Sequence, residues 1–136
     1  MTLPLLNTKL YCALPGANRV QRPRLLAHLD RGLQPGSRLL LVCAPAGYGK
    51  STLVEDWVQT ISGPAAWLSL DAADNDPNLF LAYLAAALRR VQFDLGHDPQ
   101  AYLQAAQSAV LQQVFAEWIN ALSILDAPLV LILDDF

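Results

Sequence analysis

The chain has 136 residues, of which 54% are hydrophobic and 15% charged. This composition excludes a disordered or low-complexity protein, because there is enough apolar side chain to offset the entropy lost on folding, and the length allows at most one globular domain. Nine basic and twelve acidic residues give a net charge of −3 with the arginines scattered, so we expect no nucleic-acid binding through this segment.

The sequence carries no sign of secretion or of a membrane anchor. The first residues lack a positive region, and the longest apolar runs, 39–46 and 79–88, are about half of the roughly 20 residues that cross a bilayer. Two cysteines are too few for a disulfide framework, and Cys43 lies in an apolar run, which predicts a buried thiol. We therefore expect a soluble, cytoplasmic protein that does not bind membranes.

Helical periodicity and short continuous apolar runs alternate along the chain. In order, they predict a helix at 24–33, a strand at 39–43, a helix at 49–61, a strand at 65–70, a helix from Asp76 to about Phe93, a helix around 110–125, and a strand that begins at Leu129 and ends in two carboxylates. Asp76 is the expected N-cap of its helix, and Pro77 suits the first helical position. Strands that alternate with helices predict an α/β fold with a parallel sheet. The three tryptophans, Trp57, Trp67 and Trp118, are expected in the core.

A phosphate-binding loop of the Walker A type follows the first predicted strand and opens a predicted helix. Residues 44–51 match G-x-x-x-x-G-K-[ST], with Ala44 in place of the first glycine. Glycines let the backbone curl around an anion, a lysine neutralises the β- and γ-phosphates, and a hydroxyl ligates Mg²⁺. The alternative, a Gly/Pro turn with an incidental lysine, does not account for this strand–loop–helix context. The predicted nucleotide-binding residues are Ala44, Pro45, Ala46, Gly47, Tyr48, Gly49, Lys50, Ser51 and Thr52, with Ser51 also a metal ligand and Lys50 also catalytic.

A pair of aspartates, Asp134 and Asp135, ends the last predicted strand. Two acids after an apolar strand are costly to bury unless they lie at the carboxyl edge of the sheet, where Mg²⁺ and water satisfy them. We expect Asp134 to hold Mg²⁺ and Asp135 to orient or deprotonate the attacking water. Taken alone, such a pair is more often an exposed turn, and it is the phosphate-binding loop that favours the catalytic interpretation.

Two other groups of polar residues carry weaker signals. Asp71, Asp74, Asn75 and Asp76 lack the glycine and closing glutamate of a calcium loop, so we assign them to turns and helix caps, with a contribution to the nucleotide edge as the alternative. His28 and His97 are isolated and predict ordinary surface or packing residues.

Four segments in order resemble one known family. They are Arg22-Pro23-Arg24-Leu25-Leu26, the loop with Thr52 and Leu53, Trp67-Leu68-Ser69-Leu70-Asp71 with Asp74-Asn75-Asp76-Pro77, and the closing Leu133-Asp134-Asp135-Phe136. From about Lys9 to Phe136 the chain resembles the amino-terminal part of the ATPase domain of large ATP-dependent LuxR-type transcriptional regulators of bacteria. These are relatives of the maltose regulon activator and belong to the signal-transduction P-loop ATPases with numerous domains.

The resemblance implies a P-loop NTPase three-layer sandwich with a parallel sheet, here truncated after the acidic strand. Residues 1–23 would lead into the domain, and 24–136 would form an incomplete ATPase domain. In the family, a further strand lies between the phosphate-loop strand and the acidic strand, and here it would come from beyond Phe136. We therefore expect these 136 residues alone to fold and bind nucleotide poorly.

The resemblance also implies that ATP and Mg²⁺ act as a switch that permits self-association and transcription activation, and that hydrolysis resets it. Val20 and Arg22 would approach the adenine, although Gln21 stands between them where relatives commonly have glycine. The alternative is that Arg22 only caps a helix start or forms an ion pair there. Weak ATPase activity is expected only in the complete domain, with the remainder of the regulator or intact relatives as partners. The alternative is a non-enzymatic remnant of a truncated or split gene. A P-loop kinase or a GTPase is disfavoured, because lid arginines and Asn-Lys-x-Asp are absent from the sequence.

Overall fold

The computed structural model describes residues 4–14, 16–37, 39–93, 96, 98–104 and 108–135, with residues 104 and 108–111 described by their backbone. The chain divides into two compact units, a larger one formed by Met1–Tyr11 with Gly63–Phe136 and a smaller one formed by Cys12–Ser62. His97, predicted to be an ordinary surface or packing residue, lies outside the described residues.

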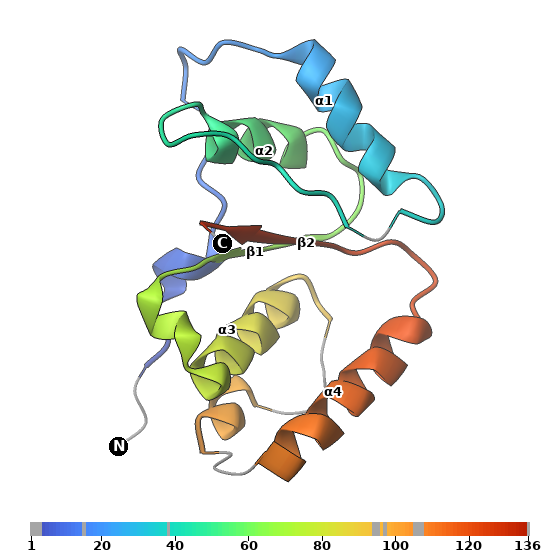
Figure 1. Cartoon of the computed structure of the whole chain (residues 1–136). Coiled ribbons are helices and arrows are strands. Elements are labelled where there is room, and N and C mark those ends of the chain that lie inside the picture. The colour runs from blue at the N-terminus through green and yellow to red at the C-terminus, as the bar shows by residue number, and fades with distance from the viewer. Residues whose placement is uncertain are drawn as a thin grey trace. The chain divides into compact units, whose positions relative to one another are not determined.

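The larger unit contains a parallel pair of strands, β1 (Ala65–Ser69) and β2 (Val130–Asp134), paired from Ala65 with Val130 to Ser69 with Asp134. Its helices are α3 (Pro77–Arg90) and α4 (Ser108–Ser123), and its 3₁₀ helices are η1 (Asn7–Leu10), η3 (Ala72–Asn75) and η4 (Pro99–Gln104). Figure 1 shows β1 and β2 side by side, with α3 packed against β1. The predicted α/β class with parallel strands is confirmed.

The core of the larger unit forms between α3 and the strands. Leu68 of β1 and Leu81 of α3 are fully buried, as expected for a strand and a helix that cover each other's apolar faces. Trp118 of α4 packs edge-to-face on Tyr102, with the ring centroids 5.6 Å apart, and its Nε1 donates to the Tyr102 hydroxyl at 3.1 Å. The predicted core positions of Trp118 and Trp67 are confirmed, since each is about 5% exposed.

Local capping sets both ends of α3. The Asp76 side chain accepts from the backbone N–H of Asn78 at 2.9 Å, which confirms Asp76 as the N-cap. The helix ends at Arg90, earlier than predicted, because Gln92 takes a left-handed φ of +63°. The N–H of Gln92 donates to the Arg89 carbonyl, and the N–H of Phe93 donates to the Leu88 carbonyl. This pair of hydrogen bonds is a Schellman motif.

The smaller unit holds α1 (Pro23–Asp30), η2 (Arg31–Leu33) and α2 (Lys50–Val58). Trp57 of α2 is 4% exposed, as predicted for a core residue, and its Nε1 donates to Asp30 Oδ1 at 2.8 Å. His28 on α1 is exposed, as predicted.

The strand predicted at 39–43 is wrong for this structure. These residues have no regular secondary structure, and Leu39 and Leu41 are 85% and 72% exposed. Within the described part of the chain, β1 and β2 are the only strands and pair with each other, so the apolar run has no ladder partner. The prediction of a buried Cys43 fails for the same reason, and its thiol is exposed.

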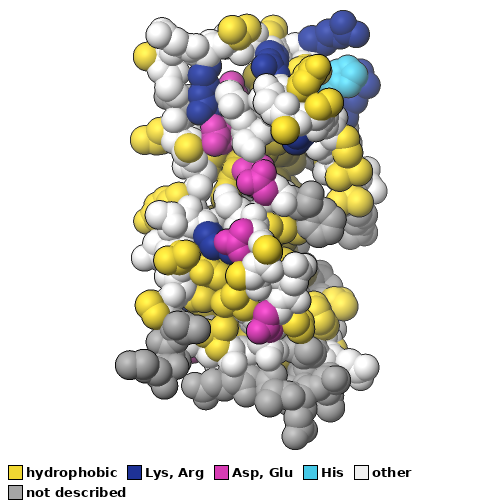
Figure 2. Space-filling view, turned by 60° about the vertical axis from the view of Figure 1, so that its left-hand side comes forward, with side chains coloured by type: hydrophobic (Ala, Val, Ile, Leu, Met, Phe, Trp, Pro, Cys, Tyr) yellow, Lys and Arg dark blue, Asp and Glu magenta, His cyan; other side chains and the backbone are white. Residues whose placement is uncertain are grey.

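Apolar side chains also reach the surface elsewhere, and Figure 2 shows them interspersed with small mixed groups of acidic and basic side chains. In the parts of the chain that the structure describes, no helix is both long enough and apolar enough to span a bilayer.

Candidate nucleotide-binding site

The predicted phosphate-binding loop, residues 44–51, contains two glycines in the left-handed conformation. Gly47 has a φ of +81° and Gly49 a φ of +75°, conformations that glycine adopts without the steric cost of a side chain. A Cβ on Gly47 would meet no atom within 4 Å, so the backbone is open to an approaching group there. The loop glycines therefore have the conformations that a cradle for an anion needs.

The start of α2 provides donors for that anion. Gly49 is the N-cap, no side chain caps the helix, and the first turn contains no acidic residue. The first backbone N–H groups of a helix have no partner within it and carry the positive end of the helix dipole. Because Ser51 and Thr52 lie in this first turn, a phosphate at the helix start would lie close to both residues.

Lys50 folds back over the loop. Its Nζ donates to the carbonyl of Ala44 at 2.6 Å and to that of Pro45 at 3.3 Å. The contact brings the ammonium to the beginning of the loop, where neutral carbonyls are its partners. A phosphate oxygen would form a stronger, charge-assisted bond with the same ammonium.

Arg22 lies on the opposite half of the loop. Its Nη1 donates to the Tyr48 carbonyl at 3.1 Å, and its Nη2 lies 2.9 Å from the position that a Cβ on Gly49 would take. Arg22 is also the N-cap residue of α1, where its carbonyl accepts from Leu25 and Leu26. Val20, the other residue expected near the adenine, is 78% exposed.

Arg19 was not predicted from the sequence as a residue of the site. Its Nη2 lies 2.6 Å from Glu55 Oε2, its Nη1 lies 3.1 Å from Asp56 Oδ1, and Nη1 also donates to the Thr52 carbonyl at 3.4 Å. The hydrogen bond to Glu55 is the main cause that raises the pKa of Arg19 above its usual value. Glu55 and Asp56 follow Arg19 by 36 and 37 positions in the sequence. The only signal for this contact was the pair of adjacent acids on a predicted helix, which indicates a basic partner but does not identify it.

The acidic pair lies at the carboxyl ends of the parallel strands in the larger unit. Asp134 is the last residue of β2, and its carbonyl accepts from the N–H of Leu70 at 2.9 Å. Asp135 follows with a left-handed φ of +63°, which is uncommon outside glycine although Asp tolerates it. Asp135 lines an open pocket of about 340 Å³ together with Leu70, Asp71, Asp74, Asn75 and Phe80.

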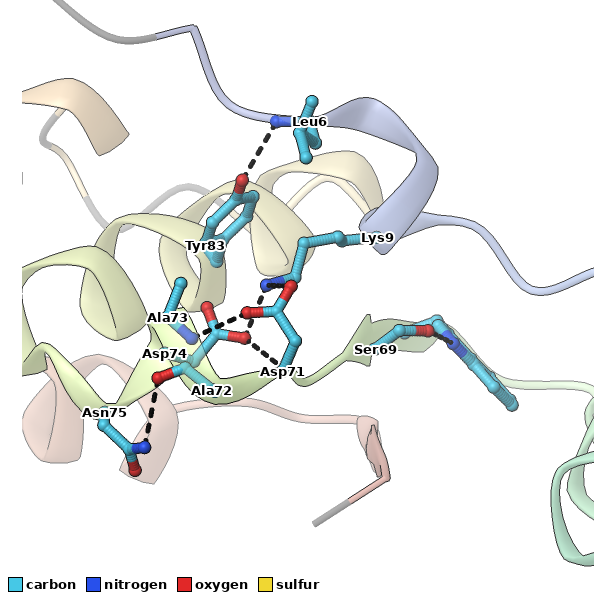
Figure 3. Close-up of polar contacts among 10 residues, drawn as sticks. Leu6, Lys9, Ser69, Asp71, Ala72, Ala73, Asp74, Asn75 and Tyr83 are labelled. Atoms are coloured by element: carbon cyan, nitrogen blue, oxygen red, sulfur yellow. Dashed lines mark hydrogen bonds and ion pairs between the residues drawn. The ribbon is translucent and has the colours of Figure 1, made fainter.

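The acidic residues after β1 act as caps, as predicted. Asp71 accepts from the N–H of Ala73 at 2.8 Å, and the Asp71 N–H donates to Asp74 Oδ2 at 2.8 Å, which forms a capping box around η3. Figure 3 shows the Lys9 ammonium between the carboxylates of Asp71 and Asp74, at 3.1 and 2.5 Å, with Tyr83 beside it.

These contacts shift two pKa values. Burial opposes the charge of Lys9, but the hydrogen bonds to Asp74 and Asp71 outweigh it and raise the pKa of Lys9 above 10.5. The backbone hydrogen bond from Ala73, followed by that from Lys9, lowers the pKa of Asp71 below 3.8. Lys9 was not predicted, because a single lysine in an apolar segment gives no sign of partners 62 and 65 residues away.

The predicted metal ligands are distributed over the two units, Ser51 in the smaller and Asp134 in the larger. Among the described residues, no group of three or more His, Cys, Asp or Glu side chains could hold a metal ion. A hydroxyl and a carboxylate suit Mg²⁺, which takes few protein ligands and completes its shell with phosphate oxygens and water. Each of the two side chains, taken by itself, therefore has the chemistry of a Mg²⁺ ligand.

A family model described as an AAA ATPase domain matches residues 19–136. The chain belongs to this family. It is also similar to proteins named HTH-type transcriptional regulator MalT: 39% identical to that of Yersinia enterocolitica, 40% to that of Serratia proteamaculans and 35% to that of Klebsiella pneumoniae. Each match extends over 132 residues, which are 97% of this chain and 14% of the relative.

These matches confirm the resemblance inferred from the motifs. The match to the AAA ATPase domain includes the phosphate-binding loop and the acidic pair, together with Arg19 and Arg22. The chain spans about one seventh of the length of the MalT regulators and corresponds to their amino-terminal ATPase part.

Proposed function

We propose that the chain is an ATP-binding switch module of a bacterial transcriptional regulator. The observation that carries this proposal is the loop of residues 44–49, whose two left-handed glycines lead into a helix start with no side-chain cap and no acidic residue. This arrangement suits an anion, and Lys50 provides the cation for it. Membership in the AAA ATPase domain family supports a nucleotide as that anion.

The residues at the site would have distinct roles. The N–H groups at the start of α2 would bind phosphate oxygens, and Lys50 would leave the Ala44 and Pro45 carbonyls for the β- and γ-phosphates. Ser51 and Asp134 would hold Mg²⁺, which when bound neutralises phosphate charge. Asp135 would accept a proton from the attacking water at its carboxylate.

We further propose that hydrolysis and self-association need more polypeptide than the described residues provide. Leu39 and Leu41 are largely exposed in a segment that would be a buried strand in a P-loop sheet. The remainder of the regulator, or an intact relative, would provide a strand that pairs with this segment. That strand would cover both leucines and fix the chain at the point where the loop of residues 44–51 begins. The exposed segment also favours the second candidate, a non-enzymatic remnant that associates with intact relatives.

A titration with a fluorescent ATP analogue tests the proposal. The analogue would be added with Mg²⁺ to the chain alone and to a version extended through the rest of the ATPase domain of a MalT relative. We expect saturable binding, displaced by unlabelled ATP, that is much tighter in the extended version. An absence of displaceable binding in both versions would contradict the proposed function, and tight binding to the chain alone would contradict the need for a further strand.

A further inference from the structure

In the smaller unit, residues 19–22 contact both α2 and the loop from which it begins. Arg19, at one end of this short segment, binds Glu55 and Asp56 on the side of α2. Arg22, at the other end, binds the Tyr48 carbonyl and covers Gly49. The two arginines therefore connect the body of the helix to the loop that precedes it.

We propose that Arg19 is a positioning residue for the phosphate-binding loop, which it controls by holding Arg22 on Tyr48 and Gly49. The role of the loop in binding a nucleotide rests on the proposed function, whereas the effect of Arg19 on the shape of the loop does not.

The link from Arg22 to the loop follows from peptide geometry. In a planar trans peptide the carbonyl and the following N–H point in opposite directions. When Arg22 holds the Tyr48 carbonyl, it also fixes the direction of the Gly49 N–H. The Arg22 guanidinium occupies the space that a side chain on Gly49 would need, so the arginine fits against the loop only because residue 49 is a glycine.

The link from Arg19 to Arg22 follows from charge and burial. Arg19, Glu55 and Asp56 are 21%, 12% and 20% exposed, so their mutual contacts replace much of their hydration. Removing Arg19 leaves two adjacent, partly buried carboxylates without this cation, which disfavours the packed arrangement. The segment that carries Arg22 would then lose its main polar attachment to α2.

Hydrogen exchange in the nucleotide-free full chain tests the proposal with Arg19→Ala and, as a matched control, the exposed Arg24→Ala. We expect exchange of the Tyr48 amide, which donates to the Pro45 carbonyl at 3.4 Å, to speed up on the order of tenfold in Arg19→Ala, the scale for losing a charge-assisted hydrogen bond, and to stay unchanged in Arg24→Ala. Equal exchange of this amide in all three proteins would overturn the proposal.

Two further variants separate positioning from general support of α2. Because Arg19 acts through Arg22, Arg22→Ala should speed up exchange of the same Tyr48 amide, and the double variant should add little to either single change. Additive effects, or equally faster exchange along 53–58, would overturn the proposal. If Arg19→Ala does not fold, Glu55→Gln and the charge swap Arg19→Glu with Glu55→Arg replace it, and the swap should restore slow exchange.

Nucleotide affinity gives an independent readout in the version that binds ATP. Arg19→Ala should weaken binding of ATP and of inorganic tripolyphosphate by the same factor, on the order of tenfold, because the phosphate cradle is disturbed. A loss confined to ATP would overturn the proposal by pointing to the base. If the parent binds neither ligand, the proposed function fails, and the exchange experiment still decides the role of Arg19.

Discussion

A side chain at Gly49 should damage the loop in two separable ways. The φ of +75° makes any L-residue there cost about 1 to 2 kcal/mol of folding free energy. The new Cβ would also lie 2.9 Å from Arg22 Nη2 and 3.3 Å from Nη1, so the guanidinium must move away from the Tyr48 carbonyl. Losing that hydrogen bond adds about 0.5 to 1.5 kcal/mol.

Gly36→Ala is the matched control for Gly49→Ala. Gly36 has a φ of +92° in the same unit, but a Cβ there meets no atom within 4 Å. Gly36→Ala should therefore cost only the backbone strain and leave ATP affinity unchanged. Gly49→Ala should be less stable than this control and should weaken ATP binding on the order of tenfold or more.

Urea unfolding gives the two stability changes, and titration with a fluorescent ATP analogue gives the two affinities. The opposite result is an equal loss of stability in both variants together with unchanged ATP affinity in Gly49→Ala. That result would mean that neither the turn at Gly49 nor its contact with Arg22 shapes the nucleotide site.

Other predictions concern the acids, the exposed segment and the pH dependence. Asp135→Asn should slow ATP hydrolysis about 100-fold or more in steady-state assays while ATP binding persists. Asp134→Asn should weaken Mg²⁺-dependent ATP binding in titrations. Hydrolysis at the parental rate in both variants would contradict these roles. Leu41→Lys should reduce self-association of the chain in sedimentation, since it places a charge on an exposed apolar segment. Thermal unfolding should show stability from Asp71 that is present above pH 3.8 and lost as the pH falls below it, because its pKa is lowered on folding. The stability from Lys9 should be present below pH 10.5 and lost above it, because its pKa is raised.

Two controls accompany these measurements. Leu14 is 83% exposed outside the predicted strand, so Leu14→Lys should leave sedimentation unchanged. An equal effect of Leu14→Lys and Leu41→Lys would indicate general solubility and contradict association through the 39–43 segment. Lys9→Met should remove the loss of stability above pH 10.5, and persistence of that loss would assign it to another group.

Local signals in the sequence were sufficient for much of the fold. The N-cap at Asp76 depends on residues within two positions of it, and the loop glycines sit at the spacing that an anion cradle requires. Both β1 and β2 come from apolar runs that were predicted as strands of a parallel sheet, whereas their pairing with each other was not predicted.

Long-range contacts explain what the sequence could not predict. The strand expected at 39–43 depends on a partner, and without one in the described residues its apolar pattern leaves leucines exposed. The ion pairs of Lys9 with Asp74 and of Arg19 with Glu55 join residues 65 and 36 positions apart, and no periodicity connects such positions.

The Schellman motif after α3 is a local feature that was not predicted, because Gln92, instead of a glycine, takes the left-handed position.

In the proposed function, the loop of residues 44–51 binds the phosphates of ATP through Lys50. The most direct measurement is a titration of ATP with Mg²⁺ into the extended version of the chain with and without Lys50→Ala, with Arg31→Ala, an exposed cation of the same unit, as the control for net charge. Lys50→Ala should weaken binding by about 2 to 4 kcal/mol, the scale for losing one member of a desolvated charge pair, and Arg31→Ala should change it little. Unchanged ATP affinity in Lys50→Ala would mean that Lys50 does not bind the nucleotide and that the loop is not its phosphate-binding site.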